Sequence, residues 1–328
     1  MKSASVVIVS PALADANNGN WQTARRWRSL LGSRYRVRIA PQWPDAQAAG
    51  DSVMLALHAR RSAEAIEAWW QARGSAGLAV VLTGTDLYHD VRVDPVARRS
   101  LELAQRLVVL QALGPAALAP ELRPKTRVIL QSTTARVPLV KGTRHLRAVM
   151  VGHLRAVKSP ETLFAAARLL ADRRDIRIDH VGAAQEPHWA EQARRTARDC
   201  PGYRWLGELP RGEVRQRIQR AHLLVHASAM EGGAHVIMEA LRSGTPVLAS
   251  RVDGNVGMLG ADYAGYFAHG DAAALAALLV QCRAEQLAPA ATPGLLLLLR
   301  EQARRRAPLF APAAEQTGLF ALLDELAG

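Results

Sequence analysis

Residues 231–246 of the 328-residue chain have the sequence EGGAHVIMEALRSGTP, which places Glu231 and Glu239 with seven residues between them. The residues just before this stretch, 223–225, are all apolar and predict a buried strand. From residue 236 onward the apolar residues follow helical spacing. Glu231 is therefore expected in a strand-to-helix loop and Glu239 on the early turns of the helix.

The chemistry of this loop suits an anion beside hydroxyl groups. Gly232 and Gly233 let the backbone approach a ligand closely. A helix start offers backbone N–H groups and a partial positive charge, which favour a phosphate. Two nearby carboxylates can accept hydrogen bonds from hydroxyl groups, and a nucleotide-sugar has both a diphosphate and hydroxyls. The plainer alternative is a helix N-terminus that carries two glutamates by coincidence.

Length and charge limit the classes of protein. A chain of 328 residues favours two domains over one core. With 42 Lys and Arg against 29 Asp and Glu, the net charge of +13 favours anionic partners. The arginines are spread along the chain among many alanines, so we expect no nucleic-acid partner. A basic nucleic-acid-binding protein remains the alternative of another class.

The two cysteines and the apolar runs bear on location. Cys200 and Cys282 have no CxxC spacing, so neither a disulfide framework nor a zinc site is indicated, and a cytoplasmic protein is expected. A strand-like run at 6–9 opens the chain without the pattern of a signal peptide. No apolar run, that at 295–299 included, approaches the length of a membrane span.

Short β-rich runs alternate with longer helical patterns, which predicts two parallel, doubly wound α/β sheets. The predicted strands are 6–10, 35–40, 53–57, 78–82, 107–110, 127–130, 146–151, 176–181, 203–206, 223–226 and 247–250. Helical patterns include 21–31, 63–73, 96–104 and 315–326. The alternation breaks at 132–144, which predicts a linker between a domain at 1–140 and a second at 145–308. The last segment, 309–328, could pack back on the first domain.

Ligands of open α/β sheets bind outside the carboxyl ends of the strands, so the loops after strands are the candidate sites. In the first domain these loops hold a set of polar residues that could bind an acceptor: Asn18, Gly19, Asn20, His58, Arg60, Arg61, Thr83, Thr85 and Asp86. Each loop also has a structural explanation. Asn20 could simply cap the helix near residue 21, Asp86 could cap another, and Arg60 and Arg61 could be solvated.

In the second domain the first strand leads into Gly152-His153-Leu154-Arg155-Ala156-Val157-Lys158. Gly152 permits a sharp turn, and Ser159-Pro160 is typical of a helix cap and first residue. Arg155 and Lys158 would neutralise a leaving diphosphate at the edge that also holds Glu231.

These motifs resemble the retaining glycosyltransferases of GT-B architecture, family 4, in which two Rossmann-like domains face a central cleft. The residues that carry the resemblance are Gly152 to Lys158, Gly207-Glu208-Leu209, and Glu231-Gly232-Gly233 through Glu239 to Gly244-Thr245-Pro246. The resemblance implies that Glu231 contacts the donor sugar, Glu239 the ribose, and Lys158 with Arg155 the diphosphate. It further implies donor contacts at Gly152, His153, Gly207, Glu208, Leu209, Gly232, Gly233, Ala234 and His235. His153 stands where the family usually has arginine.

The whole set of loops is similar to one subgroup, the selenosugar synthases of selenoneine biosynthesis. The similarity rests on residues 17–21, 58–62, 83–88 and 152–155. It implies transfer from a UDP-sugar, typically UDP-N-acetylglucosamine, to selenophosphate with formation of a carbon–selenium bond. A generic transferase acting on a lipid, glycan or small alcohol, and a UDP-sugar epimerase, remain alternatives.

Selenophosphate is an anion and already a good nucleophile, so it needs positioning more than a general base. The chain contains no Asp-x-Asp, and we expect activity without a metal or other cofactor. The sugar preference, the stereochemical outcome and the oligomeric state are left open by the sequence.

Overall fold

The computed structural model describes residues 5–11, 19–287 and 294–327, which fall into two compact units. Unit 1 consists of the described residues up to Ser132 together with the last helix, and unit 2 consists of Thr133–Ala311. The division lies at Ser132 rather than at residue 140. The chain just after it belongs with unit 2, where the backbone N–H of Arg136 donates to the carbonyl of Arg242 at 2.9 Å.

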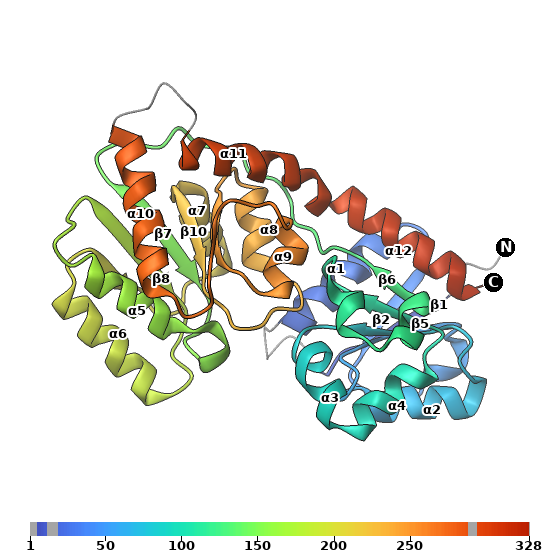
Figure 1. The fold of residues 1–328 in the computed structure, drawn as a ribbon. Coiled ribbons are helices and arrows are strands. Elements are labelled where there is room, and N and C mark those ends of the chain that lie inside the picture. Colours follow the sequence, from blue (N-terminus) through green and yellow to red (C-terminus); the bar gives the residue numbers. More distant parts are fainter. Residues whose placement is uncertain (1–4, 12–18, 288–293, 328) are drawn as a thin grey trace. The chain divides into compact units, whose positions relative to one another are not determined.

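Unit 1 is built on a six-stranded sheet with the order β2-β1-β3-β4-β5-β6, in which all neighbours are parallel (Figure 1). Its strands are β1 Ser5–Val9, β2 Arg36–Ala40, β3 Val53–Leu57, β4 Leu78–Leu82, β5 Arg106–Val109 and β6 Thr126–Val128. Each lies within two residues of its predicted bounds. The parallel α/β prediction is therefore confirmed for this unit.

Helices cover both faces of this sheet because alternate strand residues are apolar on both sides. The helices are α1 Gly19–Leu31, α2 Ala63–Arg73, α3 Val91–Val93, α4 Pro95–Leu103 and α12 Pro312–Ala327. Val7 and Val9 pack with α2 and α4, whereas Val6 and Ile8 pack with α1 and α12. The last helix of the chain thus completes the core of the first unit.

Unit 2 is a second six-stranded parallel sheet, with the order β12-β11-β10-β7-β8-β9. Its strands are β7 Leu146–Val151, β8 Ile176–Val181, β9 Tyr203–Trp205, β10 Leu223–His226, β11 Val247–Ser250 and β12 Tyr266–Phe267. The helices are α5 Pro160–Leu169, α6 Pro187–Asp199, α7 Arg211–Arg220, α8 His235–Leu241, α9 Asp253–Leu259, α10 Ala272–Leu287 and α11 Leu295–Arg306. The sequence analysis missed β12, which has only two residues.

The strand orders fix where a ligand can enter each unit. In unit 2 the order reverses between β7 and β10, and in unit 1 between β1 and β3. Such reversal points open a crevice at the carboxyl edge of a parallel sheet. Lys158 follows β7 and Glu231 follows β10, so the two lie at the reversal point of unit 2.

Among the described residues, no helix combines the length and the apolar character that crossing a bilayer requires.

Candidate functional site

Three side chains meet at the carboxyl edge of the unit 2 sheet. Nζ of Lys158 lies 2.5 Å from Oε1 of Glu231. Nε2 of His226, the last residue of β10, lies 3.1 Å from the same oxygen. The sequence analysis had expected Lys158 and Glu231 at one edge, and the structure joins them in an ion pair. His226 was missed, because nothing in the strand pattern tells which oxygen a strand-terminal histidine reaches.

The carboxylate of Glu231 is buried and ionised. Burial by itself would raise its pKa, but the charge of Lys158 and the hydrogen bond from His226 outweigh burial and hold the pKa well below its usual value. Both partners contact Oε1, and no described residue donates a hydrogen bond to Oε2. One oxygen is thus fixed by the protein while the other can accept hydrogen bonds from a ligand.

The Lys158 loop is held by its neighbours on both sides. Residues Ala156–Lys158 form a 3₁₀ turn, and the carbonyl of Val157 accepts the N–H of Ala229 at 2.9 Å. Ser159 follows with a φ of 48°, in the left-handed region. It precedes α5 as expected, but its hydroxyl lies 2.8 Å from Nε2 of His269 instead of capping the helix. The loop therefore presents Lys158 from a constrained backbone.

Gly254 fixes the backbone of Glu231 from the opposite side. A Cβ at position 254 would lie 2.0 Å from the carbonyl oxygen of Glu231 and 2.8 Å from its Cβ. Only glycine allows α9 to pack this closely, and any larger side chain would displace Glu231. Gly254 was not predicted, because the contact joins the start of α9 to the loop after β10, which are far apart in any local pattern.

Glu239 lies on α8, as predicted, and is buried near two arginines of α7. Its Oε1 lies 3.6 Å from Nη2 of Arg211 and 3.9 Å from Nε of Arg215. Burial raises the pKa of Glu239 above its ordinary value, and the two arginine charges offset only part of that rise. The protein therefore lowers the pKa of Glu231 and raises the pKa of Glu239.

The other predicted donor residues lie on the loops expected for them. Gly207 has a φ of 66°, which favours glycine, between β9 and α7. Gly232 and Ala234 are buried, and the N–H of Ala234 donates to the sulfur of Met258 at 3.1 Å. The remaining ones are half-buried or exposed: Gly152, His153, Arg155, Glu208, Leu209, Gly233 and His235. Their ligand contacts stay predictions.

In unit 1, His58 is the centre of a polar cluster after β3 and β4. It is buried, and its φ of 74° is unusual for a residue other than glycine. Its Nδ1 lies 3.9 Å from Asp86 and its Nε2 3.9 Å from Asp90. Burial lowers the pKa of His58, and the charge of Asp86 offsets part of that effect. The structure adds Asp90 to the residues that the sequence analysis had named.

The neighbouring predicted acceptor residues differ in their surroundings. Oγ1 of Thr85 lies 3.4 Å from Nε2 of His58, and the N–H of Arg61 donates to Nδ1 at 3.4 Å. The guanidinium of Arg60 pairs with Asp94 at 2.6 Å and is largely exposed. Thr83 is half-buried. Among these, Thr85 and Arg61 lie directly against the histidine.

Asp86 has a structural part in this loop. Its Oδ1 accepts the N–H groups of Thr83 at 2.9 Å and Gly84 at 2.8 Å, and its Oδ2 accepts that of Ala59 at 3.0 Å. It opens a single π-helical turn, Asp86–Asp90. The carboxylate thereby ties the loop after β4 to the loop after β3.

The start of α1 differs from the prediction. Gly19 and Asn20 are its first two residues, and the hydroxyl of Thr23 donates to the carbonyl of Gly19 at 2.8 Å. The prediction that Asn20 caps the helix is therefore wrong, since turn-forming residues locate a helix start only to within about one turn. Asn18 lies outside the described residues.

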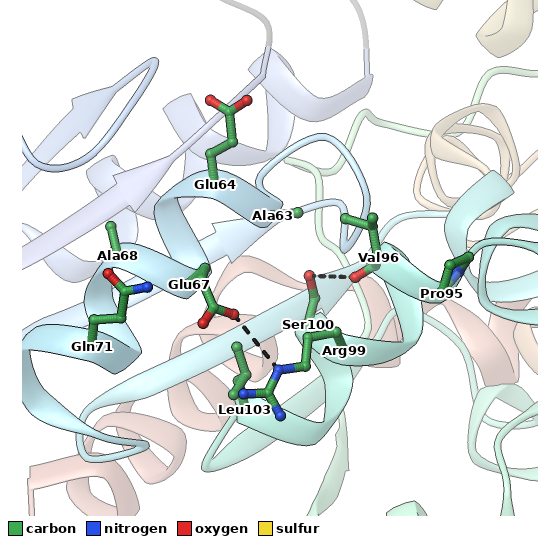
Figure 2. A pocket seen from close by; sticks show the side chains of 10 residues that line it. All are labelled: Ala63, Glu64, Glu67, Ala68, Gln71, Pro95, Val96, Arg99, Ser100 and Leu103. Carbon is green, nitrogen blue, oxygen red and sulfur yellow. Dashed lines mark hydrogen bonds and ion pairs between the residues drawn. The ribbon is translucent and has the colours of Figure 1, made fainter.

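A groove of about 580 Å³ runs between α2 and α4 of unit 1 (Figure 2). Apolar side chains line it, among them Ala63, Ala68, Val96 and Leu103, with the Glu67–Arg99 ion pair at 3.7 Å. None of the predicted acceptor residues lines this groove. Its first lining residue, Ala63, directly follows the His58–Ser62 loop in the chain. The groove is nevertheless a separate feature, because no residue of the His58 cluster lines it.

Comparison with known proteins agrees with the fold and the motifs. Residues 131–286 match the family of glycosyl transferases group 1. Over 115 residues the chain is 28% identical to glycosyltransferase 1 domain-containing protein 1 of Xenopus tropicalis, which covers 35% of this chain and 33% of that protein. The chain thus matches only about a third of the length of this curated relative.

Solved structures match nearly the whole chain. Sucrose-phosphate synthase from Thermosynechococcus elongatus has a TM-score of 0.77 at 19% identity, covering 98% of this chain and 99% of that one. HepE from Anabaena, in complex with UDP and glucose, has a TM-score of 0.72 at 15% identity, with coverages of 98% and 99%. At this level of identity the likeness establishes the fold, which is the expected pair of Rossmann-like domains. The chain therefore has the GT-B fold, and its residues 131–286 are similar to the glycosyl transferases group 1.

Proposed function

We propose that this protein is a glycosyltransferase that transfers a sugar from a UDP-sugar, with UDP-N-acetylglucosamine as the typical donor of the subgroup it resembles, to selenophosphate. The observation that carries the transferase part is the Lys158–Glu231 pair at the reversal point of the unit 2 sheet. Glu239 nearby offers a second carboxylate. The complex of HepE with UDP and glucose supports a UDP-sugar as the donor. The choice of selenophosphate rests on the resemblance of the first-unit loops to selenosugar synthases.

In the proposed reaction, unit 2 holds the donor. Glu239 accepts hydrogen bonds from the ribose, Oε2 of Glu231 accepts them from the sugar, and Lys158 with Arg155 balances the diphosphate. Selenium of selenophosphate attacks the anomeric carbon, and the bond from that carbon to the diphosphate oxygen breaks. Its electron pair leaves with UDP, where Lys158 stabilises the growing negative charge.

Unit 1 is proposed to hold the acceptor. The His58 cluster provides polar groups at the carboxyl edge of its sheet, with Arg61 and Thr85 next to the imidazole. The test is incubation of the protein with UDP-N-acetylglucosamine, with and without selenophosphate, followed by mass spectrometry. UDP release that depends on selenophosphate, with a selenium-containing sugar product, is expected. UDP release with another acceptor would indicate a generic transferase, and conversion of the donor without an acceptor would indicate an epimerase.

Lys158→Ala tests the role of the lysine in departure of the diphosphate. We expect turnover to fall by roughly a hundred-fold, the usual loss when one preorganised charge partner of a transition state is removed. Lys158→Met is the matched variant, because methionine keeps an unbranched side chain of similar length but not the charge. Steady-state rates of UDP release measure both. Unchanged turnover in either variant would contradict the role of Lys158.

Independence from metal ions is a separate prediction. The chain has no Asp-x-Asp to hold a metal against the diphosphate, and Lys158 and Arg155 are proposed to balance that charge instead. We expect the rate of UDP release to be unchanged after dialysis against EDTA. Full loss of activity that magnesium or manganese restores would overturn this prediction.

A further inference from the structure

His226 occupies a place that the proposed reaction does not yet use. It ends β10, whose neighbours on both sides are strands, and it pairs in register with Ala249 of β11. Its side chain is 1% exposed, so it cannot contact solvent or a substrate directly. Its Nε2 reaches Oε1 of Glu231 at 3.1 Å. A buried histidine in a central strand is thus fixed against the carboxylate that is proposed to contact the sugar.

In the proposed reaction Lys158 has two partners, Glu231 and the leaving diphosphate, and His226 keeps Glu231 hydrogen-bonded when Lys158 turns to the diphosphate. In the structure Lys158 and His226 share one oxygen of Glu231. During transfer, Lys158 is also proposed to balance the leaving diphosphate. As its ammonium turns toward the diphosphate, Glu231 loses part of its charge partner while remaining buried. His226 is then the one described side chain that still donates to Oε1.

We infer that His226 is a positioning residue for sugar transfer, which donates its Nε2–H to Glu231 and holds that carboxylate in place when Lys158 engages the diphosphate. This inference rests on the proposed function of the site. An ionised carboxylate only accepts hydrogen bonds, so Nε2 must carry the proton in either charge state of the imidazole. The charged groups that face Glu231 are Lys158, from the turn after β7, and His226 itself. The hydrogen bond from His226 helps keep the pKa of Glu231 low.

The decisive comparison is between His226→Leu and His226→Gln. Leucine keeps the volume but removes the donor, whereas the glutamine amide can still donate to Oε1. His222→Gln is the matched control, because His222 is also 1% exposed and directly precedes the first residue of the same strand. Its imidazole bonds the N–H of Arg147 at 3.0 Å and lies 3.0 Å from the carbonyl of Gly142, away from Glu231.

Calorimetry with UDP and with UDP-N-acetylglucosamine separates positioning from folding. We expect His226→Leu to bind UDP as the wild type does, but to bind the UDP-sugar at least about ten-fold more weakly, the loss of one hydrogen bond to a charged group. We expect His226→Gln to restore most of that affinity. We expect His222→Gln to leave both affinities unchanged. Thermal melting of each variant shows whether the unit remains folded.

Turnover gives a second readout. We expect His226→Leu to lower kcat, because Glu231 loses the donor that holds its carboxylate in place, and His226→Gln to restore most of the lost turnover. Equal UDP-sugar affinity in wild type and His226→Leu, or equal defects in His226→Leu and His226→Gln, would overturn the inference. If the wild type binds the UDP-sugar but transfers nothing to selenophosphate, selenophosphate is not the acceptor. The UDP-sugar affinities of the His226 variants still test the positioning role of His226.

Discussion

At the scale of single residues, Glu231 and Glu239 are both buried and yet differ in electrostatics. Lys158 lies at hydrogen-bond distance from Glu231 and lowers its pKa. The arginines near Glu239 stand 3.6 Å and 3.9 Å from its Oε1, and burial still raises its pKa. The first carboxylate is therefore ionised at any physiological pH, and the second becomes protonated at a higher pH than an ordinary glutamate.

This difference predicts the pH dependence of UDP binding. If the ribose donates to the Glu239 carboxylate, UDP affinity should fall as the pH falls through the raised pKa of Glu239. Glu239→Gln should bind UDP more weakly at neutral pH and with a flatter pH profile. Calorimetry over a pH series, with Glu231 ionised throughout, measures this. A wild-type profile as flat as that of the variant would contradict the role of Glu239.

The raised pKa of Glu239 affects the stability of unit 2 in the direction opposite to its effect on UDP affinity. Burial penalises ionised Glu239 in the folded state, so protonation at low pH relieves that penalty and stabilises unit 2. Loss of UDP affinity on acidification therefore cannot be ascribed to unfolding through this group.

At the scale of elements, α12 adds a buried carboxylate, Glu315, to the apolar contacts that pack this helix in the core of unit 1. Glu315 accepts hydrogen bonds from Nε of Arg26 at 2.8 Å, Nε1 of Trp27 at 2.6 Å and the N–H of Ser132 at 2.8 Å. These donors come from α1 and from the point where the chain leaves unit 1. One residue thus joins the last helix to two earlier segments.

Glu315→Ala should destabilise unit 1 by about 3–5 kcal/mol, the usual cost of removing one partner of a buried ion pair. Arg26, Trp27 and Ser132 would all lose their acceptor. Asp324→Ala is the matched control on the same helix, because Asp324 and its partner Arg34 are both exposed, and it should cost less than about 1 kcal/mol. Urea unfolding followed by circular dichroism gives both values. Equal stabilities of the two variants would show that the buried network contributes little.

At the scale of the whole molecule, each unit has its own parallel sheet, and each of these sheets has its own reversal point. UDP is proposed to bind unit 2 alone, so it should stabilise that unit selectively, by about 2.7 kcal/mol at a hundred-fold excess over Kd. Unfolding of the wild type and Glu315→Ala, each with and without UDP, tests this. UDP should raise the transition of unit 2, and the substitution should lower that of unit 1. A single transition that responds equally to both changes would argue against separate units.

Most of the fold follows from local sequence patterns, because strand and helix periods are properties of short stretches of the chain. Strands such as β3, β4, β7, β8, β10 and β11 have their predicted bounds. The strand–loop–helix pattern around Glu231 also placed both glutamates on the correct elements. Local signals were weaker at element ends: Asn20 lies inside α1, and the two-residue β12 has too few residues for any period.

Which side chains meet at the site depends on the assembled sheets. Strand order is not written in any local pattern, and it is the neighbouring position of β7 and β10 that brings Lys158 to Glu231. The close packing of Gly254 against Glu231 and the reach of His226 to its Oε1 depend on the same sheet. The sequence therefore indicated a donor loop with two carboxylates. In the folded protein Glu231 contacts a lysine and a histidine, whereas burial has the larger effect on the pKa of Glu239. These differences could not be predicted, because contacts between distant loops exist only once the sheet is assembled.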